Sequence, residues 1–135
     1  MKKFYKINLK KIEDLRDGII SVAESNKEIP FDIKRVYFIT DLHPSESTRG
    51  YHAHKNLDQA IFCISGSFTL MLDNGEEKES FLLNDSNAGM FLPKHVWHTM
   101  SNFSKNCILL IFASDYFDEN DYLRNYSDFK KFINV

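Results

Sequence analysis

The chain has 135 residues, of which 43% are apolar and 27% charged, with twelve Phe and six Tyr. A domain of this size buries enough surface to fold without disulfides or structural metals, and its many aromatic residues favour strands. The formal net charge is −2, from 17 basic and 19 acidic residues without an isolated basic cluster, so the electrostatic footprint of a nucleic-acid-binding protein is missing.

The N-terminus starts with lysines, as a secretory signal does, but Asn8, Lys10 and Lys11 interrupt any apolar segment of such a signal. No apolar run reaches the length that a membrane span needs. Cys63 and Cys107 lie in apolar runs, without a second Cys or a His at ligand spacing, and we interpret both as reduced core thiols. These features predict a cytoplasmic protein that does not contact membranes.

Short strands are expected along most of the chain, at residues 31–40, 51–54, 59–64, 67–72, 76–83, 89–92, 97–103 and 107–113. The fourth and fifth are predicted to form a hairpin, because Asn74-Gly75 between two such runs is a strong turn signal that needs positive φ at both residues. Successive short strands separated by Gly, Asn and Pro favour a sandwich or jelly roll over a parallel α/β sheet. We therefore predict an all-β fold.

Aromatic residues after Ser114 recur at near-helical spacing among Asp, Asn and Lys. This pattern predicts a short C-terminal helical segment that packs its aromatic side chains on the strands. Near the other end, residues 12–24 are compatible with a further helical turn.

His52 and His54 alternate within an expected strand, so their imidazoles project from the same face. Gln59 and Gly66 follow at the spacing of the first cupin motif, G-x5-H-x-H-x3-4-E-x6-G, with Gln in place of the Glu and without the first Gly. This half of the pattern predicts a site on one face of a sheet.

The second cupin motif, G-x5-P-x-G-x2-H-x3-N, is also present, with a shorter first gap and with His95 in place of its second Gly. The matching residues are Gly89, Pro93, His98 and Asn102. Two half-motifs in the right order resemble the cupin superfamily. The resemblance implies a single cupin-type jelly-roll barrel in which His52, His54 and His98 surround one cavity.

Whether the histidine cluster binds a metal ion depends on Gln59. A metallocupin usually holds its ion with three His and one Glu, and the carboxylate offsets the charge of the cation. Gln59 carries no charge, and the neighbouring Asp58 points to the opposite face of a regular strand. We therefore expect no metal and no other cofactor, and imidazoles that act as general acids and bases near neutral pH.

Four stretches resemble the sugar nucleotide 3,4-ketoisomerases, cupins that act on dTDP-4-keto-6-deoxyglucose: FDIKRVYFI (31–39), RGYHAHK (49–55), VWH (96–98) and ASDYFDENDYLR (113–124). The likeness runs from about Pro30 to Ile133. It implies one cupin ketoisomerase domain over residues 1–135, a homodimer without a metal, and a role in making a 3-amino-3,6-dideoxy sugar for a lipopolysaccharide or other glycan. An aminotransferase would act next on the product.

The resemblance also implies roles for individual residues. His52 and His54 are the expected catalytic residues, and Arg49, His98 and Tyr37 are the expected substrate-binding residues, with Arg49 near the diphosphate. In a 4-keto sugar the carbonyl acidifies the C3 hydrogen, so an imidazole can remove it and form an enediol, and protonation at C4 then moves the ketone to C3. We favour His54 as the carbon base and assign His52 to the O3/O4 pair.

Other interpretations remain open at this point. The three histidines suit a metal-dependent cupin oxygenase, against which Gln59 argues. A cupin that binds a sugar nucleotide without catalysis, and an epimerase on the same substrate, are further alternatives. Arg49 also suits a surface ion pair with Glu46 or Asp58, and His95 suits the pocket rim.

Overall fold

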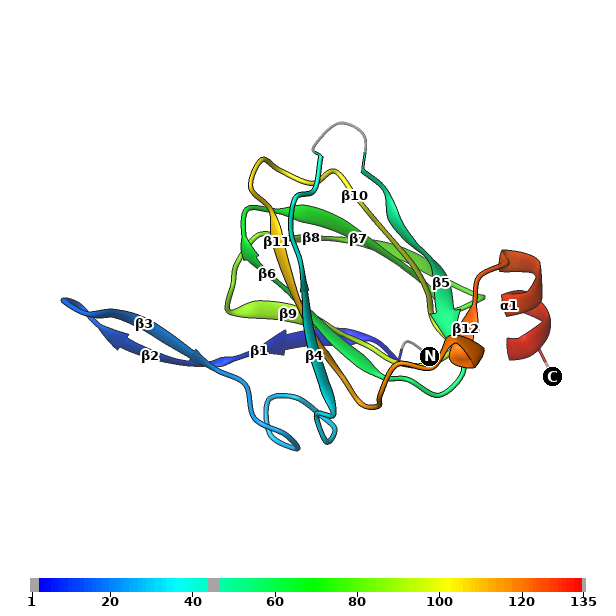
Figure 1. The fold of residues 1–135 in the computed structure, drawn as a ribbon, viewed down its shortest axis with the longest axis horizontal. Helices are drawn as coiled ribbons and strands as arrows, with labels where there is room; N and C mark the ends of the chain where they lie inside the picture. Colours follow the sequence, from blue (N-terminus) through cyan, green and yellow to red (C-terminus); the bar gives the residue numbers. More distant parts are fainter. Residues whose placement is uncertain (1–2, 44–46, 135) are drawn as a thin grey trace.

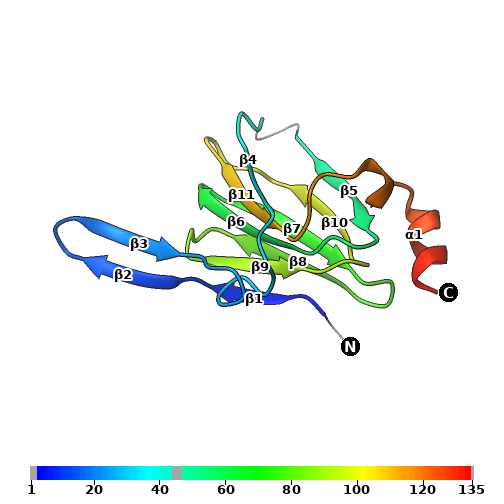
Figure 2. The ribbon, with the colours of Figure 1, turned by 60° about the horizontal axis from the view of Figure 1, so that its bottom comes forward.

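A computed structural model describes residues 3–43 and 47–134, which form two antiparallel five-stranded sheets (Figures 1 and 2). The first sheet has the order β1 (Tyr5–Asn8), β9 (Ala88–Leu92), β6 (Gln59–Ser65), β11 (Ile108–Ala113) and β4 (Arg35–Ile39). The second has the order β12 (Tyr122–Leu123), β5 (Arg49–His54), β10 (Trp97–Ser101), β7 (Phe68–Asp73) and β8 (Lys78–Leu83). Apart from the β7–β8 hairpin, consecutive strands from β4 to β12 alternate between the sheets. This is the predicted jelly roll.

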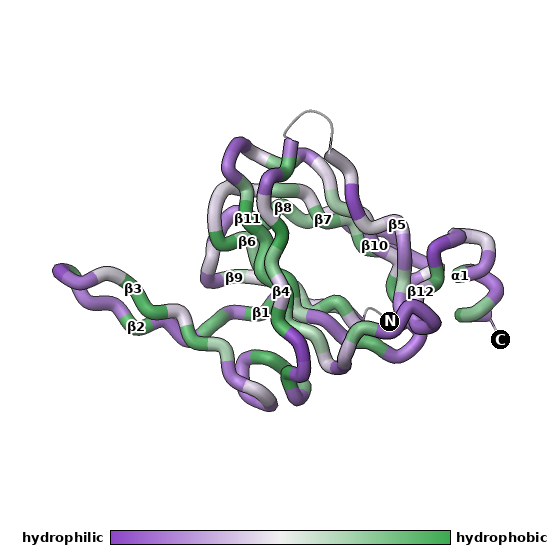
Figure 3. The backbone as a smooth tube through the Cα atoms, viewed as in Figure 1, coloured by the Kyte–Doolittle hydropathy of each residue, from purple (hydrophilic) through white to green (hydrophobic). Residues whose placement is uncertain are grey.

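The main core lies between the two sheets. On β7 the side chains of Phe68, Leu70 and Leu72 are fully buried, as alternation along a strand requires, and Leu109 and Ile111 on β11 belong to the same cluster. Figure 3 shows hydrophobic stretches along β4, β6 and β11. The apolar runs that predicted these strands are therefore the ones that fill the barrel.

Cys63 and Cys107 are buried free thiols, as expected, with their Sγ atoms 3.6 Å apart. Burial raises the pKa of Cys63 to about 12, so this thiol stays protonated.

The C-terminal aromatic residues cover the outer face of the second sheet. Asn125 caps the helix α1 (Tyr126–Ile133), because its side chain accepts a hydrogen bond from the Asp128 N–H. The helix buries Phe129 against Trp97, with ring centroids 5.8 Å apart. The predicted helical segment is confirmed. Among the described residues, no helix is long and apolar enough to cross a membrane.

The predicted β7–β8 hairpin is confirmed, but its turn differs from the expected one. Asp73 pairs with Lys78, so the loop has four residues, and only Gly75, with φ of 96°, adopts positive φ. The Asn74 side chain instead accepts hydrogen bonds from the N–H groups of Glu76 and Glu77. The side chain of Asn74 thus shapes the loop, a frequent alternative to positive φ for this residue type.

Residues 31–34 do not extend β4, contrary to the expected strand over 31–40. Phe31 is buried with Ile29 and Phe62 in a second cluster that involves a loop and the first sheet. The apolar character of this stretch therefore reflects packing of a loop rather than pairing of a strand.

The expected helical turn over residues 12–24 is wrong. This segment belongs to a hairpin of β2 (Lys10–Asp14) and β3 (Gly18–Val22), which pair only with each other and extend away from the barrel as an arm (Figures 1 and 2). Gly18, with φ of 102°, begins β3, and the β-branched residues Ile19, Ile20 and Val22 favour the strand.

Candidate active site

Two of the three expected histidines, His52 and His98, line a pocket of about 210 Å³ between the edge strand β4 and strands β5 and β10, and His54 is buried directly beside His52. The residues that line it are Arg35, Tyr37, Ile39, Arg49, Gly50, His52, His98, Met100 and Tyr122. A larger cleft of about 640 Å³ lies between α1 and the β7–β8 loop, and His95 is the only histidine among its lining residues. We place the site in the smaller pocket because the imidazoles converge there.

Strand register brings the imidazoles together. His52 and His54 alternate on β5, with ring centroids 5.0 Å apart and rings perpendicular. His98 on β10 pairs directly with His52, and their centroids lie 4.4 Å apart. The two half-motifs therefore meet across one strand pair, as the sequence predicts.

Hydrogen bonds define the tautomers of the two β5 imidazoles. His54 Nδ1 lies 2.9 Å from Asp121 Oδ2, and His52 Nδ1 lies 3.0 Å from the Gly50 carbonyl oxygen. Since both partners only accept, each Nδ1 carries the proton and each Nε2 presents a lone pair. His54 Nε2 is buried and has no hydrogen-bond partner among the described residues. Both imidazoles are therefore presented as bases.

All three imidazoles are neutral near pH 7. Burial lowers the pKa of His54 to about 4, with a further contribution from His52, although Asp121 acts in the opposite direction. Burial also lowers the pKa of His52 and holds that of His98 well below its usual range. A neutral imidazole keeps one nitrogen lone pair free to accept a proton, and the carboxylate beside His54 partly offsets the cost of burying the imidazolium that forms.

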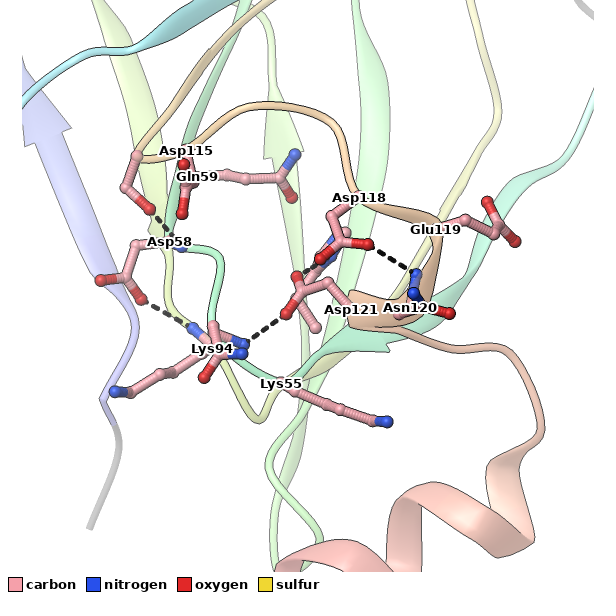
Figure 4. A network of polar contacts seen from close by, with 12 residues as sticks. Lys55, Asp58, Gln59, Lys94, Asp115, Asp118, Glu119, Asn120 and Asp121 are labelled. Carbon is pink, nitrogen blue, oxygen red and sulfur yellow. Dashed lines mark hydrogen bonds and ion pairs between the residues drawn. The ribbon is translucent and has the colours of Figure 1, made fainter.

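Asp121 is a residue of the site that the sequence patterns did not reveal. Its Oδ1 accepts a hydrogen bond of 2.7 Å from the Asn56 N–H while Oδ2 holds His54, so the buried carboxylate is fixed at both oxygens. The 3-10 turn η1 (Glu119–Asp121), capped by Asp118, brings it to β5 (Figure 4). The contact joins residues 67 positions apart, and no spacing rule reveals it.

Tyr122 is a second site residue that the sequence did not reveal, because the spacing of the aromatic residues after Ser114 predicts only packing on the strands. It follows η1, and its ring lies 5.0 Å from that of His52 and 4.5 Å from that of His54. Arg124 lies over the same ring at 4.1 Å.

Strand β4 contributes two residues to the pocket lining: Tyr37, which was predicted to bind substrate, and Arg35, which was not predicted as a site residue. Gln59 Nε2 donates a hydrogen bond of 2.5 Å to the Tyr37 hydroxyl oxygen. The Arg35 guanidinium lies 5.1 Å from the centre of the Tyr37 ring, and its buried Nε has no hydrogen-bond partner in the part of the chain that the structure describes.

Arg49 lines the pocket at the start of β5. Of the two alternative ion-pair partners, Glu46 lies outside the described residues. Asp58 instead accepts a hydrogen bond from the Lys94 N–H, away from the pocket, as its place on the opposite face predicts (Figure 4). Arg49 is thus placed where it can meet an anionic ligand.

The remaining histidine of the second half-motif does not line the pocket of the cluster. His95 adopts φ of 68°, which explains why glycine is usual at this position of the motif, and its Nε2 bonds the Lys55 carbonyl oxygen. Trp97 packs on α1 and Tyr51 is exposed, so both face away from the pocket.

The residues suit a divalent ion poorly. No group of three or more His, Cys, Asp or Glu within residues 3–43 and 47–134 is arranged to hold a metal. Gln59, at the position of the cupin carboxylate, contacts Tyr37 through its amide nitrogen. An amide nitrogen that donates a hydrogen bond offers no lone pair to a cation, and the neutral side chain of Gln59 brings no charge to offset one.

A jelly roll that gathers neutral imidazoles and two arginines around an internal pocket is a cupin barrel equipped for proton transfer on an anionic ligand. Comparison with known proteins identifies the family. The chain belongs to the family described as FdtA, WxcM-like, C-terminal, whose model matches residues 2–134.

Relatives with a named activity support this family assignment. A TDP-4-oxo-6-deoxy-alpha-D-glucose-3,4-oxoisomerase from Aneurinibacillus thermoaerophilus is 46% identical over 127 residues, which cover 94% of this chain and 90% of that protein. The crystal structure of a 3,4-ketoisomerase from Helicobacter canadensis is 39% identical, with a TM-score of 0.94 and 100% of both chains covered.

A mutant of the 3,4-ketoisomerase QdtA from Thermoanaerobacterium thermosaccharolyticum, in complex with TDP-4-keto-6-deoxyglucose, is 38% identical, with a TM-score of 0.93. The match covers 99% of this chain and 96% of QdtA. The assignment to the sugar nucleotide 3,4-ketoisomerases is confirmed, and with it the expectation of an enzyme.

Proposed function

We propose that this protein moves the ketone of dTDP-4-keto-6-deoxyglucose from C4 to C3 through an enediol. The observation that carries the proposal is the pair of adjacent β5 imidazoles, both held as Nδ1–H tautomers so that each Nε2 keeps its lone pair, with His52 lining the pocket and His54 directly beside it. Membership of the family and the relatives' activities support the same reaction. The oxygenase and binding-protein alternatives are not favoured.

In the proposed mechanism, His54 Nε2 removes the C3 hydrogen as a proton. The electron pair of the C–H bond forms the C3–C4 double bond, and the carbonyl π electrons move to the C4 oxygen. Asp121 stabilises the imidazolium. His52 moves the proton from O3 to O4, and the His54 imidazolium, whose N–H can exchange with water, gives a proton to C4, which completes the ketone at C3 and restores neutral His54. Each proton that leaves one site is thereby returned to another.

We further propose that Arg49 binds the diphosphate, because a guanidinium offers a planar fork of donors to phosphate oxygens. His98 and Tyr37 line the same pocket and would contact the sugar. The reaction would take place in the cytoplasm, where an aminotransferase would use the 3-ketone to make a 3-amino-3,6-dideoxy sugar for a surface glycan.

The proposal includes a homodimer. A two-stranded hairpin is marginally stable alone, yet the arm exposes Ile12, Ile19 and Ile20. On the outer face of β4, Val36 and Phe38 are 54% and 68% exposed. A second copy that covers these surfaces would remove both from water.

Light scattering at micromolar concentration tests the dimer. We expect twice the chain mass, and a shift toward the monomer in Ile19→Asp, but no shift in the control Leu82→Asp, which alters an exposed apolar residue on the other sheet. A monomeric wild-type protein would refute the dimer.

The activity test uses dTDP-4-keto-6-deoxyglucose and no added metal. We expect NMR to show the carbonyl move from C4 to C3, and the product spectrum also reports the configuration at C4. Binding of the substrate without turnover would support the non-catalytic alternative, and inversion of a ring carbon with the ketone still at C4 would support an epimerase.

A further inference from the structure

A group that donates a hydrogen bond to the C4 oxygen is needed in the proposed reaction, on which this inference rests. When C3 loses its proton, negative charge develops on that oxygen, and a preorganised donor at this point lowers the barrier. The imidazoles do not provide one in their neutral state. The N–H groups of His52 and His54 are held by Gly50 and Asp121, and His98 bonds the backbone of His52 through its ring, while its Nδ1 has no partner among the described residues.

Tyr37 is positioned to donate this hydrogen bond to the C4 oxygen. It lines the same pocket as His52 and His98. Its hydroxyl oxygen accepts a hydrogen bond from the amide nitrogen of Gln59, whose side chain is buried. Because the amide N–H donates, the Tyr37 O–H must point elsewhere, and the described part of the chain offers it no acceptor.

We propose that Gln59 fixes the direction of this hydrogen bond, so that the Tyr37 hydroxyl donates to the C4 carbonyl oxygen of the substrate and to the enediolate that follows. Tyr37 is then a catalytic residue, and Gln59 is a positioning residue. At the position where a metallocupin has its carboxylate ligand, this chain uses an amide to orient a hydroxyl donor.

The surroundings of Tyr37 favour this role. The Arg35 guanidinium lies 5.1 Å from the centre of its ring and forms no ion pair among the described residues, so it adds positive potential where charge develops. Burial raises the pKa of Tyr37, so the hydroxyl keeps its proton at pH 7.

The test compares steady-state kinetics of Tyr37→Phe, Gln59→Glu and the double variant, with a chelator present so that a new carboxylate cannot recruit a metal. Tyr37→Phe is expected to lower kcat about 10²-fold, the lower end for loss of one oxyanion donor, with KM within about threefold. Gln59→Glu introduces a side chain that only accepts when ionised, so it captures the Tyr37 O–H and is expected to lower kcat by a similar factor.

The double variant is expected to lose less than about threefold more than Tyr37→Phe alone, because both changes remove the same donor. Tyr126→Phe is the matched control. It removes a hydroxyl that bonds Asp73 at 2.7 Å, outside the site, and should leave kcat unchanged. Circular dichroism and thermal melting confirm that each variant is folded.

Three results would overturn the inference while the proposed function stands. The first is a wild-type kcat in folded Tyr37→Phe. The second is a wild-type kcat in Gln59→Glu, which would mean that Gln59 accepts from Tyr37. Multiplicative losses in the double variant would also reject the coupling. A wild-type protein that does not isomerise the substrate would overturn both the proposed function and this inference.

Discussion

The substitution Asp121→Asn tests the arrangement around His54. In the wild-type protein both carboxylate oxygens accept, one from His54 Nδ1–H and the other from the Asn56 N–H. Asparagine has only one acceptor oxygen. If that oxygen stays on the Asn56 N–H, the amide N–H₂ faces His54 Nδ1 and favours the tautomer with its proton on Nε2. The lone pair that should remove the C3 hydrogen is then lost.

The size of the effect follows from the 2.9 Å contact. A carboxylate and an imidazolium about 4 Å apart attract each other by about 4 kcal/mol at an effective dielectric constant of 20. Loss of that interaction in the transition state lowers the rate about 10³-fold. The corresponding Asp→Asn change in a Ser–His–Asp triad costs about 10⁴-fold, mainly through the wrong tautomer. We therefore expect kcat to fall between about 10³-fold and 10⁴-fold, with little change in KM.

Two measurements check this prediction. NMR of the sugar nucleotide gives kcat, and ¹⁵N chemical shifts of His54 report which ring nitrogen carries the proton. Asp118→Asn is the matched control, because Asp118 caps the same turn without contacting His54, and asparagine also caps well. A folded Asp121→Asn enzyme with kcat within tenfold of wild type, or with an unchanged His54 tautomer, would refute the reasoning.

Four further predictions concern the same pocket. His54→Asn and His52→Asn should each lower kcat by about 10²-fold or more, and turnover in D₂O should place deuterium at C4. Full retention of protium at C4, with normal turnover in both variants, would exclude the enediol route through histidine. Arg49→Ala should raise KM more than it lowers kcat, whereas equal losses in kcat and kcat/KM would move Arg49 into the chemistry. Activity should survive dialysis against a chelator, since Gln59 leaves the histidines without a carboxylate ligand; stoichiometric iron or zinc whose removal abolishes turnover would contradict this. Finally, the pKa of His54 falls from 6.5 to about 4 on folding, so the unfolded chain takes up the proton first as the pH falls. The stabilisation from neutral His54 is complete above about pH 6.5 and is lost as the pH falls toward 4. Urea unfolding at pH 7 and pH 5 should show the loss, and a smaller pH dependence in His54→Asn; equal dependence in both proteins would exclude His54 as its source.

Local patterns predicted much of the fold. Alternation and apolar runs predicted the strands of the barrel, and the spacing of His52, His54 and His98 predicted that they form one cluster, because strand periodicity and jelly-roll pairing follow from local residue types. The same signals failed over residues 12–24, where a pattern compatible with a helical turn is a hairpin instead. The strand predicted over residues 31–40 is longer than β4 for a related reason, since an apolar residue such as Phe31 is buried equally well by a loop.

The sequence by itself determined the residue types of the site and the face on which the histidines of β5 lie, because side chains alternate along a strand whatever its partners. Only the tertiary structure decided what those residues can do. The tautomer of His54 depends on Asp121, 67 positions away, and the direction of the Tyr37 hydroxyl depends on Gln59 across the sheet. Hydrogen bonds between distant segments follow from the path of the whole chain. Burial, which lowers the pKa values of the imidazoles, likewise exists only once the barrel has closed around them.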